Sequence, residues 1–437
     1  MGILNLVSLI GLFALVGLSF LFSVDRKRVP RRTIWMGILI QLIFALLVLG
    51  IPALGIAGPL RFLFDWANDA VLAVLKFTEE GSRFVFGDLV NTQKFGFIIA
   101  FQVLPIIIFM SALMALLYHM GVMQKVVAFF AVIMQKLLRT SGAESLSASA
   151  NIFFGQTEAP LVVRPFIARM TESELFCVMV GGMATVAGSV LGAYTGLLKA
   201  KIPDIAGHLL TASVLSSPAA LVISKIMFPE RGEPETLGKI PDEYRMQKLD
   251  ANAIEAVARG AGEGLQLALN VAAMLIAFIA VIALGDSVFK WFGHLIHFES
   301  WGQSLVPALM RADGHPVELS LSLIFGWFFA PIAWLMGISW SESPLAGVLL
   351  GQKVVLNEFV AYLNLSHWMN QLSDRTVVIL SYALCGFANF SSIGIQIGGI
   401  GGIAPNRKSD LARLGIKSVI GGSIAAFMTA AIAGILI

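Results

Sequence analysis

Long apolar runs alternate with short polar segments along the whole chain, and many of the runs have the length of a bilayer crossing. A transmembrane α-helix needs about 20 consecutive, mainly apolar residues. We assign such helices to eight runs, at residues 2–23, 34–55, 95–120, 173–198, 206–227, 264–285, 376–402 and 416–437. The pattern therefore predicts an all-α polytopic membrane protein with eight transmembrane helices.

Several segments between these runs mix polar and apolar positions. Residues 60–92 and 122–139 place charged side chains beside Leu, Phe and Val at helical spacing, which is typical of helices that lie along the membrane interface. Residues 229–252 are rich in Glu, Pro, Arg and Asp and predict a polar cytoplasmic loop. Residues 287–340 are mixed in character and contain an apolar run over 319–338.

Polar residues also interrupt otherwise apolar sequence at two places. Residues 151–166 carry Asn, Gln, Thr, Glu and Arg, together with one glycine and two prolines, and residues 340–365 repeat this theme. Irregular backbone at membrane depth is tolerated only where it is buried in protein or lines a water-filled cavity, and proline interrupts a helix. We therefore predict two re-entrant helical hairpins, at about residues 141–170 and 340–366.

Basic residues are concentrated in two short segments, residues 25–32 and 406–413. Loops rich in Lys and Arg remain on the cytoplasmic side of a membrane. Counting crossings from either segment gives the same orientation, which places the N- and C-termini outside. The first run lacks a basic start and a cleavage site, so we expect it to be retained as a span.

The two polar stretches begin similar units. Gln-Thr-Glu at 156–158 is followed by Gly-Met-Ala-Thr at 182–185 inside a span, and Asn-Glu at 357–358 is followed by Gly-Phe-Ala-Asn at 386–389 inside another. Each unit then reads as a span, a hairpin, a broken span and a span, so the second unit is inverted relative to the first. Inverted repeats with interrupted helices are typical of secondary transporters, and the interruptions indicate the binding site.

These features divide the chain into four parts. Residues 1–92 hold the N-terminal scaffold spans and interfacial helices, and residues 93–228 hold the first repeat with its hairpin. Residues 229–262 are predicted to form a cytoplasmic loop and an interfacial helix, and residues 263–437 hold the second repeat with its hairpin.

The composition supports a membrane protein and excludes several other classes. Of the 437 residues, 57% are hydrophobic and only 13% are charged, whereas soluble domains carry about 25% charged residues. The net charge of +3 is too small to indicate a nucleic-acid partner. Cys177 and Cys385 both lie inside apolar runs, so we expect packing residues and neither a disulfide framework nor a metal site.

Two glutamates are the strongest functional candidates. Glu158 and Glu358 lie in the two polar interruptions, and an ionisable side chain inside a membrane is expensive and therefore a functional hypothesis by default. The structural alternative is that a nearby cation neutralises each one. Arg164 follows Glu158, and Lys353 precedes Glu358, at a spacing that allows this pairing.

Neutral polar residues near the glutamates offer donors and acceptors that suit the hydroxyl and amide groups of a ligand. In membrane helices the same residue types often bond only to neighbouring helices, so spacing alone leaves both roles open. Phe387 can provide a flat wall for a ring or pack in the core. The neutral candidates are Gln156, Thr157, Asn389 and Ser392.

Other chemistries find little support. His294 and His297 have the spacing of one helix face but no third ligand nearby, and the sequence contains no P-loop and no Gly-x-Ser-x-Gly motif. An intramembrane enzyme would need a nucleophile–base pair or a metal cluster, neither of which we find. A purely structural membrane protein would leave two buried glutamates unexplained. We therefore predict a transporter, not an enzyme, with no cofactor.

Three motifs resemble those of a known family. They are Gly-Gln-Thr-Glu-Ala-Pro-Leu-Val-Val-Arg-Pro at 155–165, Asn-Glu-Phe-Val-Ala-Tyr at 357–362 and Cys-Gly-Phe-Ala-Asn-Phe-Ser-Ser-Ile-Gly at 385–394. In this order they closely resemble the concentrative nucleoside transporter family, and the resemblance covers nearly the whole chain. The chain is similar to the bacterial form with eight spans.

The resemblance implies an architecture and an activity. The implied architecture is a homotrimer in the bacterial cytoplasmic (inner) membrane, in which each subunit has a scaffold domain and a mobile transport domain. The implied activity is import of nucleosides such as uridine, coupled to an ion, by an elevator-like alternating-access mechanism. The partners would then be the nucleoside, the coupling ion and the lipid bilayer, without nucleic acid.

For the substrate, the resemblance implies two groups of contacts. The nucleobase contacts are Gln156 and Thr157, with Phe387 and Val190 packed against the ring. The ribose contacts are Glu358, Asn389 and Ser392, with Glu158 nearby.

For the coupling ion, the resemblance implies a sodium site. Its ligands would be the side chains of Asn151 and Thr185 and the backbone carbonyls of Phe154 and Val186. Phe154 is bulkier than the aliphatic residue expected at its position, which bears on the shape of the ion site.

Two alternatives remain open at this point. Proton coupling is the nearer one, because Glu158 can carry a proton, whereas Asn151 and Thr185 favour sodium. Transport of an amino acid or a dicarboxylate is disfavoured, because a carboxylate ligand would want an unpaired cationic partner and the expected pocket is acidic. The sequence leaves the preference between purines and pyrimidines undecided.

Overall fold

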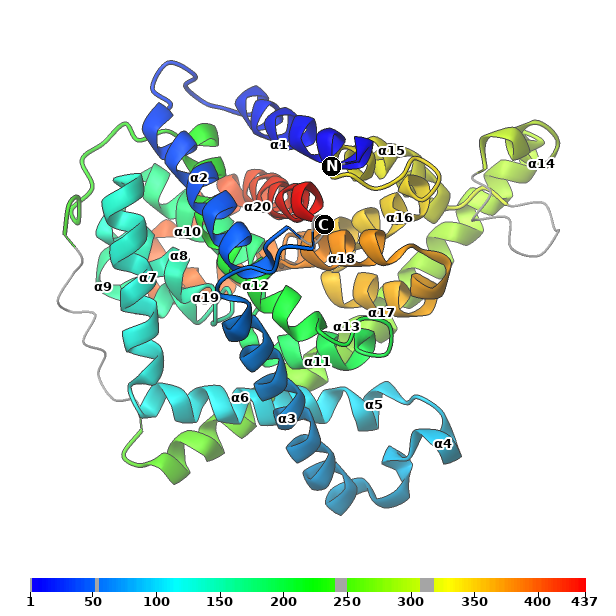
Figure 1. Ribbon diagram of the computed structural model, residues 1–437, viewed down its shortest axis with the longest axis horizontal. Coiled ribbons are helices and arrows are strands. Elements are labelled where there is room, and N and C mark those ends of the chain that lie inside the picture. The colour runs from blue at the N-terminus through cyan, green and yellow to red at the C-terminus, as the bar shows by residue number, and fades with distance from the viewer. Residues whose placement is uncertain (1, 52–54, 240–249, 307–317) are drawn as a thin grey trace.

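The computed structural model describes residues 2–51, 55–239, 250–306 and 318–437, and these are almost entirely helical (Figure 1). Within these ranges there is no β-strand, and the only extended pairings are two isolated antiparallel bridges, Ile51 with Ile56 and Ser141 with Leu237. The prediction of an all-α fold is confirmed.

Three helices form the N-terminal part, and glycine ends two of them. They are α1 (Ile3–Leu21), α2 (Arg31–Leu49) and α3 (Arg61–Phe86). Gly50 (φ +72°) follows α2 and Gly87 (φ +59°) follows α3, and both have a left-handed backbone that glycine adopts without strain. The buried face of helix α3 mixes apolar residues such as Phe64 with polar ones such as Asn68, whereas its acidic residues and several large apolar residues are exposed. The position of this helix along the membrane interface stays a prediction.

The first repeat follows the N-terminal part, after short helical turns at η2 (Gly87–Val90), α4 (Thr92–Phe95) and α5 (Ile99–Gln102). Its helices are α6 (Leu104–His119), α7 (Val122–Leu138), α8 (Gly142–Ala150), η3 (Ala159–Val163), α9 (Arg164–Ile167), α10 (Glu172–Ala184), α11 (Gly188–Leu198) and α12 (Ile205–Met227).

The second repeat has a similar order of elements. It begins with a helix of 43 residues, α13 (Ala253–Leu295), followed by the short α14 (Phe298–Trp301) and η5 (Gly302–Leu305). The remaining helices are α15 (Leu321–Leu335), α16 (Ser343–Val355), α17 (Glu358–Trp368), η7 (Met369–Gln371), α18 (Asp374–Leu384), α19 (Phe390–Ile403), η8 (Pro405–Arg407) and α20 (Lys408–Leu436).

Two predicted spans are broken in the middle. The span predicted at 173–198 consists of α10 and α11, separated by residues 185–187, and the span predicted at 376–402 consists of α18 and α19, separated by residues 385–389. Each predicted hairpin contains a helix, a break and further helical turns. Their insertion into the membrane as re-entrant hairpins stays a prediction.

Local sequence explains where several of these helices begin. Ser141 and Thr171 each accept a hydrogen bond from the backbone N–H three residues later, and the glutamate at that position bonds back to the cap. Asn357 and Asn389 cap α17 and α19 in a similar way, with side-chain oxygens that accept from the N–H of Val360 and Ser392. The asparagines therefore fix the start of a helix directly after each interruption of the second repeat.

Helices α12 and α20 form the centre of the molecule (Figure 1). Helix α12 is buried along nearly its whole length and α20 from Ser418 onward, with α1, α2, α10 and α18 packed around them. Helix α13 lies at the periphery against α6 and exposes most of its apolar surface. A helix that exposes Leu, Ile and Phe over this length has the character expected of a surface that faces lipid or another subunit.

The ends of the predicted cytoplasmic segments lie together. The N–H of Val24 donates to the carbonyl oxygen of Met227 (2.9 Å), Thr171 donates to Glu230 (2.9 Å), and Arg413 pairs with Glu172. Both basic segments therefore lie at one end of the molecule, which agrees with the common side that the sequence predicts.

A buried ionic cluster stands near the same end. The Lys225 ammonium on α12 pairs with Glu144 on α8, lies 3.4 Å from Glu230 and donates to the Ser173 hydroxyl (2.8 Å). Glu144 lies on α8, Glu230 follows α12 and Ser173 lies on α10. The lysine on α12 therefore joins the first hairpin helix to α10 and to the segment after α12.

The structure differs from the sequence predictions at several points. Residues 253–262 are the first turns of α13 and do not form a separate interfacial helix, because the helical pattern continues without a capping signal. The second basic segment is mostly helical, since α20 already begins at Lys408. Seven helices of the described chain are long and apolar enough to cross a membrane. Of the predicted loop at 229–252, residues 240–249 lie outside the described residues.

The two Gly-x-Ala motifs that suggested the repeat do not occupy equivalent positions. Gly182 lies inside α10, two residues before its last residue, whereas Gly386 lies in the break after α18. The helix ends give the better correspondence, with Thr185 and Cys385 as the residues that follow α10 and α18.

Gly386 allows a test of the break. Its φ of +147° and the backbone oxygens of Met183 and Ala184, 2.8 and 2.9 Å from an added Cβ, leave no room for a side chain. Gly386→Ala is expected to lower the free energy of unfolding by at least about 1–3 kcal/mol, measured by thermal unfolding in detergent. Gly398→Ala on α19 is the control, because nothing lies within 4 Å of its added Cβ. Equal stability of the two variants would contradict the prediction that Gly386 has no room for a side chain.

Candidate functional site

The breaks of the two repeats meet near the centre of the molecule. The N–H of Phe387, in the second break, donates to the carbonyl oxygen of Thr185 in the first (3.3 Å). The N–H of Gly188, which starts α11, donates to the carbonyl oxygen of Phe153 in the first hairpin (2.9 Å). Segments that lie about 200 residues apart in the sequence therefore share one site.

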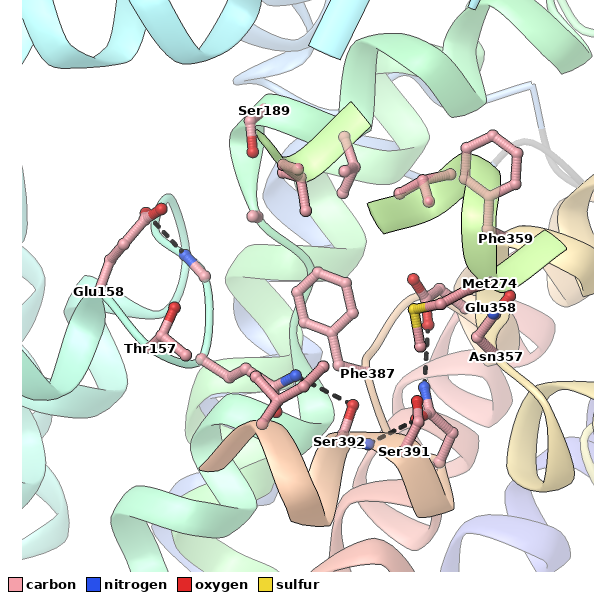
Figure 2. Close-up of a pocket in the computed structure, with 18 of the residues that line it drawn as sticks. Thr157, Glu158, Ser189, Met274, Asn357, Glu358, Phe359, Phe387, Ser391 and Ser392 are labelled. Carbon is pink, nitrogen blue, oxygen red and sulfur yellow. Dashed lines mark hydrogen bonds between the residues drawn. The ribbon is translucent and has the colours of Figure 1, made fainter. Parts of the chain in front are cut away.

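A cavity of about 150 Å³ opens beside these breaks (Figure 2). A single water needs only about 10–15 Å³ by the same measure, so the cavity has room for a larger solute. All eight predicted substrate residues line it, namely Gln156, Thr157, Glu158, Val190, Glu358, Phe387, Asn389 and Ser392.

Glu358 is the buried acid of the cavity. It is 5% exposed and is the first residue of α17, where the helix dipole favours a negative charge. Its two oxygens accept hydrogen bonds from the Tyr194 hydroxyl (2.9 Å) and the Asn389 amide (3.2 Å). The suggested pairing with Lys353 is wrong, because that ammonium donates to the carbonyl oxygen of Ala383 (2.8 Å).

Glu158 differs from Glu358 in its surroundings. Its side chain is exposed, and one oxygen accepts a hydrogen bond from the N–H of Gly155 (3.2 Å). Arg164 is also exposed and, among the described residues, forms no ion pair with Glu158, so the suggested neutralisation is wrong. In Figure 2, Glu158 lies at one side of the cavity, away from Glu358. The cavity thus holds one enclosed and one accessible carboxylate.

A chain of neutral polar groups runs beside Glu358. The Gln156 amide donates to the Ser392 hydroxyl (2.9 Å), and the Asn389 oxygen accepts from the N–H of Ser392 (2.9 Å) and the Ser391 hydroxyl (2.7 Å). The Gln156 oxygen is buried and has no hydrogen-bond partner in the described part of the chain. A buried acceptor without a donor favours a ligand that supplies one.

The remaining walls are apolar. Phe387 projects into the cavity between the polar groups (Figure 2). Val190, which is 3% exposed, also lines the cavity. Leu267, Val271 and Met274 close the side formed by α13. A site with a carboxylate and amides on one side and a phenylalanine face beside them suits a solute that combines a flat ring with hydroxyl groups.

Two of the four residues expected at the ion site, Asn151 and Thr185, contact the same residue, Gly181. Asn151 follows α8 and packs on Gly181 of α10, where an added Cβ would lie 3.1 Å from its amide nitrogen. The Asn151 side-chain oxygen is buried without a partner in the described chain. Thr185 donates its hydroxyl proton to the carbonyl oxygen of Gly181 (2.9 Å), which leaves its lone pairs available. Oxygen ligands of this kind suit a hard cation.

Phe154 and Val186, whose carbonyl oxygens are the other two expected ligands, are both buried. The Phe154 ring packs edge-on against Tyr118 of α6, with the ring centroids 5.6 Å apart, and Val186 is buried in the first break. The bulky ring of Phe154 therefore packs against α6. The expected ion ligand is the backbone carbonyl oxygen of Phe154, which does not depend on the size of the side chain.

Sequence reasoning missed several lining residues. Tyr194 is the most important, and it lies four residues after Val190 on the same face of α11, a spacing that could have identified it. Ser391 adjoins Ser392. The α13 residues Leu267, Val271 and Met274 are spaced as one helix face, but nothing in an apolar span distinguishes a face toward a cavity from one toward lipid.

Three family profiles match the chain in order. Residues 10–89 match "Na+ dependent nucleoside transporter N-terminus", residues 100–201 match "Nucleoside recognition", and residues 208–434 match "Na+ dependent nucleoside transporter C-terminus".

Curated relatives include proteins of bacteria and animals. An "uncharacterized transporter" of Haemophilus influenzae is 43% identical over 99% of this chain and 98% of the relative. Solute carrier family 28 member 3 of Mus musculus is 40% identical over 99% of this chain and 59% of the relative. Sodium/nucleoside cotransporter 1 of Rattus norvegicus is 38% identical over 99% and 64%. The chain thus spans about three-fifths of the two animal proteins.

Solved structures show the same fold. CNTnw in an inward-facing substrate-bound state is similar with a TM-score of 0.86 and 42% identity, over 99% of this chain and 98% of that one. A CNTnw variant in an intermediate state has a TM-score of 0.87 and 41% identity, with full coverage of both chains.

Tyr194→Phe tests the hydrogen bond to Glu358. The substitution keeps the ring stacked on Tyr362 but leaves one carboxylate oxygen without its donor. Because a hydrogen bond to a charged group contributes about 1.5–3 kcal/mol and a neutral one about 0.5–1.5 kcal/mol, it should destabilise the protein more than Tyr362→Phe. That control removes only a bond to the carbonyl oxygen of Ser381 (2.6 Å). Thermal unfolding gives the comparison, and a larger effect of Tyr362→Phe would contradict the prediction.

Proposed function

The chain belongs to the concentrative nucleoside transporter family, whose members are transporters and not enzymes, and we propose that it imports nucleosides together with a coupling ion. The observation that carries this proposal is the cavity in which Glu358 lies enclosed, held by Tyr194 and Asn389 beside the face of Phe387. This arrangement offers a nucleoside both a carboxylate and a ring contact.

We assign the ribose to the acidic side of the cavity. A carboxylate can accept hydrogen bonds from two neighbouring hydroxyls, and Glu358 retains lone pairs beyond those bonded to Tyr194 and Asn389. Asn389 and Ser392 would complete this set, with Glu158 nearby. The cost of an intramembrane glutamate is then offset by recognition of the substrate.

The nucleobase would lie beside Phe387 and Val190, with Gln156 and Thr157 at its edge. The unpaired oxygen of Gln156 can accept from a base N–H, and its amide can turn from Ser392 to the ligand. Uridine is the substrate we choose for the test, since its ring offers both a donor and acceptors at one edge.

We propose sodium as the coupling ion, bound by Asn151, Thr185 and the carbonyl oxygens of Phe154 and Val186. The support is the unpaired oxygen of Asn151 beside the hydroxyl of Thr185. Proton coupling is the second candidate, and the exposed carboxylate of Glu158 favours it. The ion would order the first hairpin, so ion and nucleoside would each raise the affinity for the other.

The transport cycle we propose is elevator-like alternating access. The two hairpins and the broken-helix pairs of both repeats would form the transport domain and move against a scaffold that includes α1–α3, α6 and α13. CNTnw is known in outward-facing, intermediate and inward-facing states, and we propose the same succession here. The assembly would be a homotrimer in a bacterial inner membrane with both termini outside.

The direct test is uptake of labelled uridine by proteoliposomes under an inward sodium gradient, an inward proton gradient, or neither. We expect accumulation with sodium alone. Glu358→Gln should reduce uptake about 10–100-fold, since it removes a charge-assisted hydrogen bond, while Glu80→Gln on the exposed face of α3 should not. Accumulation with protons alone would move the coupling role to Glu158, and no accumulation with the intact protein would refute the proposal.

Thr185→Val tests the ion site against a matched control. Thr185 and Thr195 are both buried threonines, and each donates to the carbonyl oxygen four residues earlier (2.9 and 3.0 Å). Only Thr185 lies at the break. Loss of one ligand worth about 1.4 kcal/mol or more should raise the half-saturating sodium concentration about tenfold or more, whereas Thr195→Val should leave it unchanged. Equal sodium dependence of the two variants would contradict the assignment.

A further inference from the structure

Lys353 is a buried cation that the proposed function has not used. It lies in the last turn of α16, is 0% exposed, and donates to the carbonyl oxygen of Ala383 (2.8 Å) with its ammonium 5.6 Å from the centre of the Phe427 ring. No carboxylate among the described residues lies within ion-pair distance of it. The carboxylate of Glu358 acts on it electrostatically from beyond ion-pair distance. A buried charge without a direct ion-pair partner is expensive and calls for an explanation.

The two repeats can be compared at their helix ends. In the first repeat, Asn151 follows α8 and Thr185 follows α10. In the second repeat, Leu356 follows α16 and Cys385 follows α18. Leu and Cys provide no side-chain oxygen, so the second repeat lacks the hard-cation ligands that the first repeat carries at the corresponding ends.

Lys353 places its charge at this end of the second repeat. Ala383, whose carbonyl oxygen it binds, belongs to the last turn of α18. Gly181, on which Asn151 packs and whose carbonyl oxygen Thr185 binds, belongs to the last turn of α10. The carbonyl end of a helix carries a partial negative charge that favours a cation, and each broken helix therefore has a place for one.

We infer that the Lys353 ammonium is a tethered cation, which occupies in the second repeat the place that sodium occupies in the first. The inference rests on the proposed sodium coupling. Because this cation is covalently attached, the second repeat binds and releases no ion during transport. The chain should then couple a single sodium ion to each nucleoside, and the identity of residues 353, 356 and 385 sets that ratio.

The experiment measures the sodium-to-nucleoside ratio in proteoliposomes, from the reversal potential of uridine flux and from the order of the sodium activation curve. The unaltered protein is expected to show first-order activation and a ratio of one. The triple variant Lys353→Ala, Leu356→Asn and Cys385→Thr removes the tethered cation and supplies side-chain oxygens. It is expected to show second-order activation and a ratio of two.

Two single variants separate the charge from its surroundings. Lys353→Met keeps the length of the side chain but removes the charge and supplies no oxygen, so uptake should fall about tenfold or more at every sodium concentration. Lys225→Met is the matched control, because Lys225 is also buried but is paired with Glu144 and Glu230 away from both breaks. The Lys225→Met protein that folds should keep first-order activation by sodium.

Three outcomes would overturn the inference. They are a ratio of two in the unaltered protein, unchanged uptake by Lys353→Met, and a first-order curve from a triple variant that folds and transports. The first two remain decisive if the triple variant does not fold. An absence of gradient-driven uptake in the unaltered protein would instead refute the proposed transport function, so the two failures can be told apart.

Discussion

Backbone groups at a helix break inside an apolar protein have no water to bond, and this constraint organises the molecule. The first break bonds to the second through Thr185 and Phe387, and the first hairpin bonds to α11 through Phe153 and Gly188. Since each break supplies partners for another segment, neither repeat can form its central region alone. Near the breaks, the side-chain oxygens of Asn151 and Gln156 have no partner among the described residues, and they are available to a ligand.

The repeats use buried charge in contrasting ways. Lys225 pairs with two carboxylates and connects helices, whereas Lys353 forms no ion pair among the described residues and contacts a carbonyl oxygen and an aromatic ring. The acids differ as well, since Glu358 is enclosed by donors and Glu158 is exposed. Burial alone therefore does not define a role, and the immediate partners of each charge decide it.

Much of the fold was readable from the sequence because local signals are strong in such a chain. Capping residues such as Ser141 and Asn389 start helices where they stand, and glycine and proline interrupt the apolar runs. The eight candidate substrate residues also line one cavity. The sequence did not identify the side-chain partners of the two glutamates. Arg164 and Lys353 are near the glutamates in sequence, but Arg164 is exposed and forms no ion pair with Glu158 among the described residues, and Lys353 donates to Ala383. The spacing of Tyr194 from Val190 could place it on the cavity side of α11, but spacing within one helix gives no information about its partner Glu358 in another segment.

The wall formed by α13 has a consequence for movement. The polar residues that line the cavity belong to the two predicted hairpins and the two broken spans, whereas α13 contributes only Leu267, Val271 and Met274. Contacts with these side chains are non-directional, so a solute held by the opposite wall can slide past α13 without exchanging a single hydrogen bond. In the proposed cycle, resistance to movement of the transport domain past α13 would then come from packing alone. The size of the α13 side chains, more than their chemistry, would set the rate of this movement.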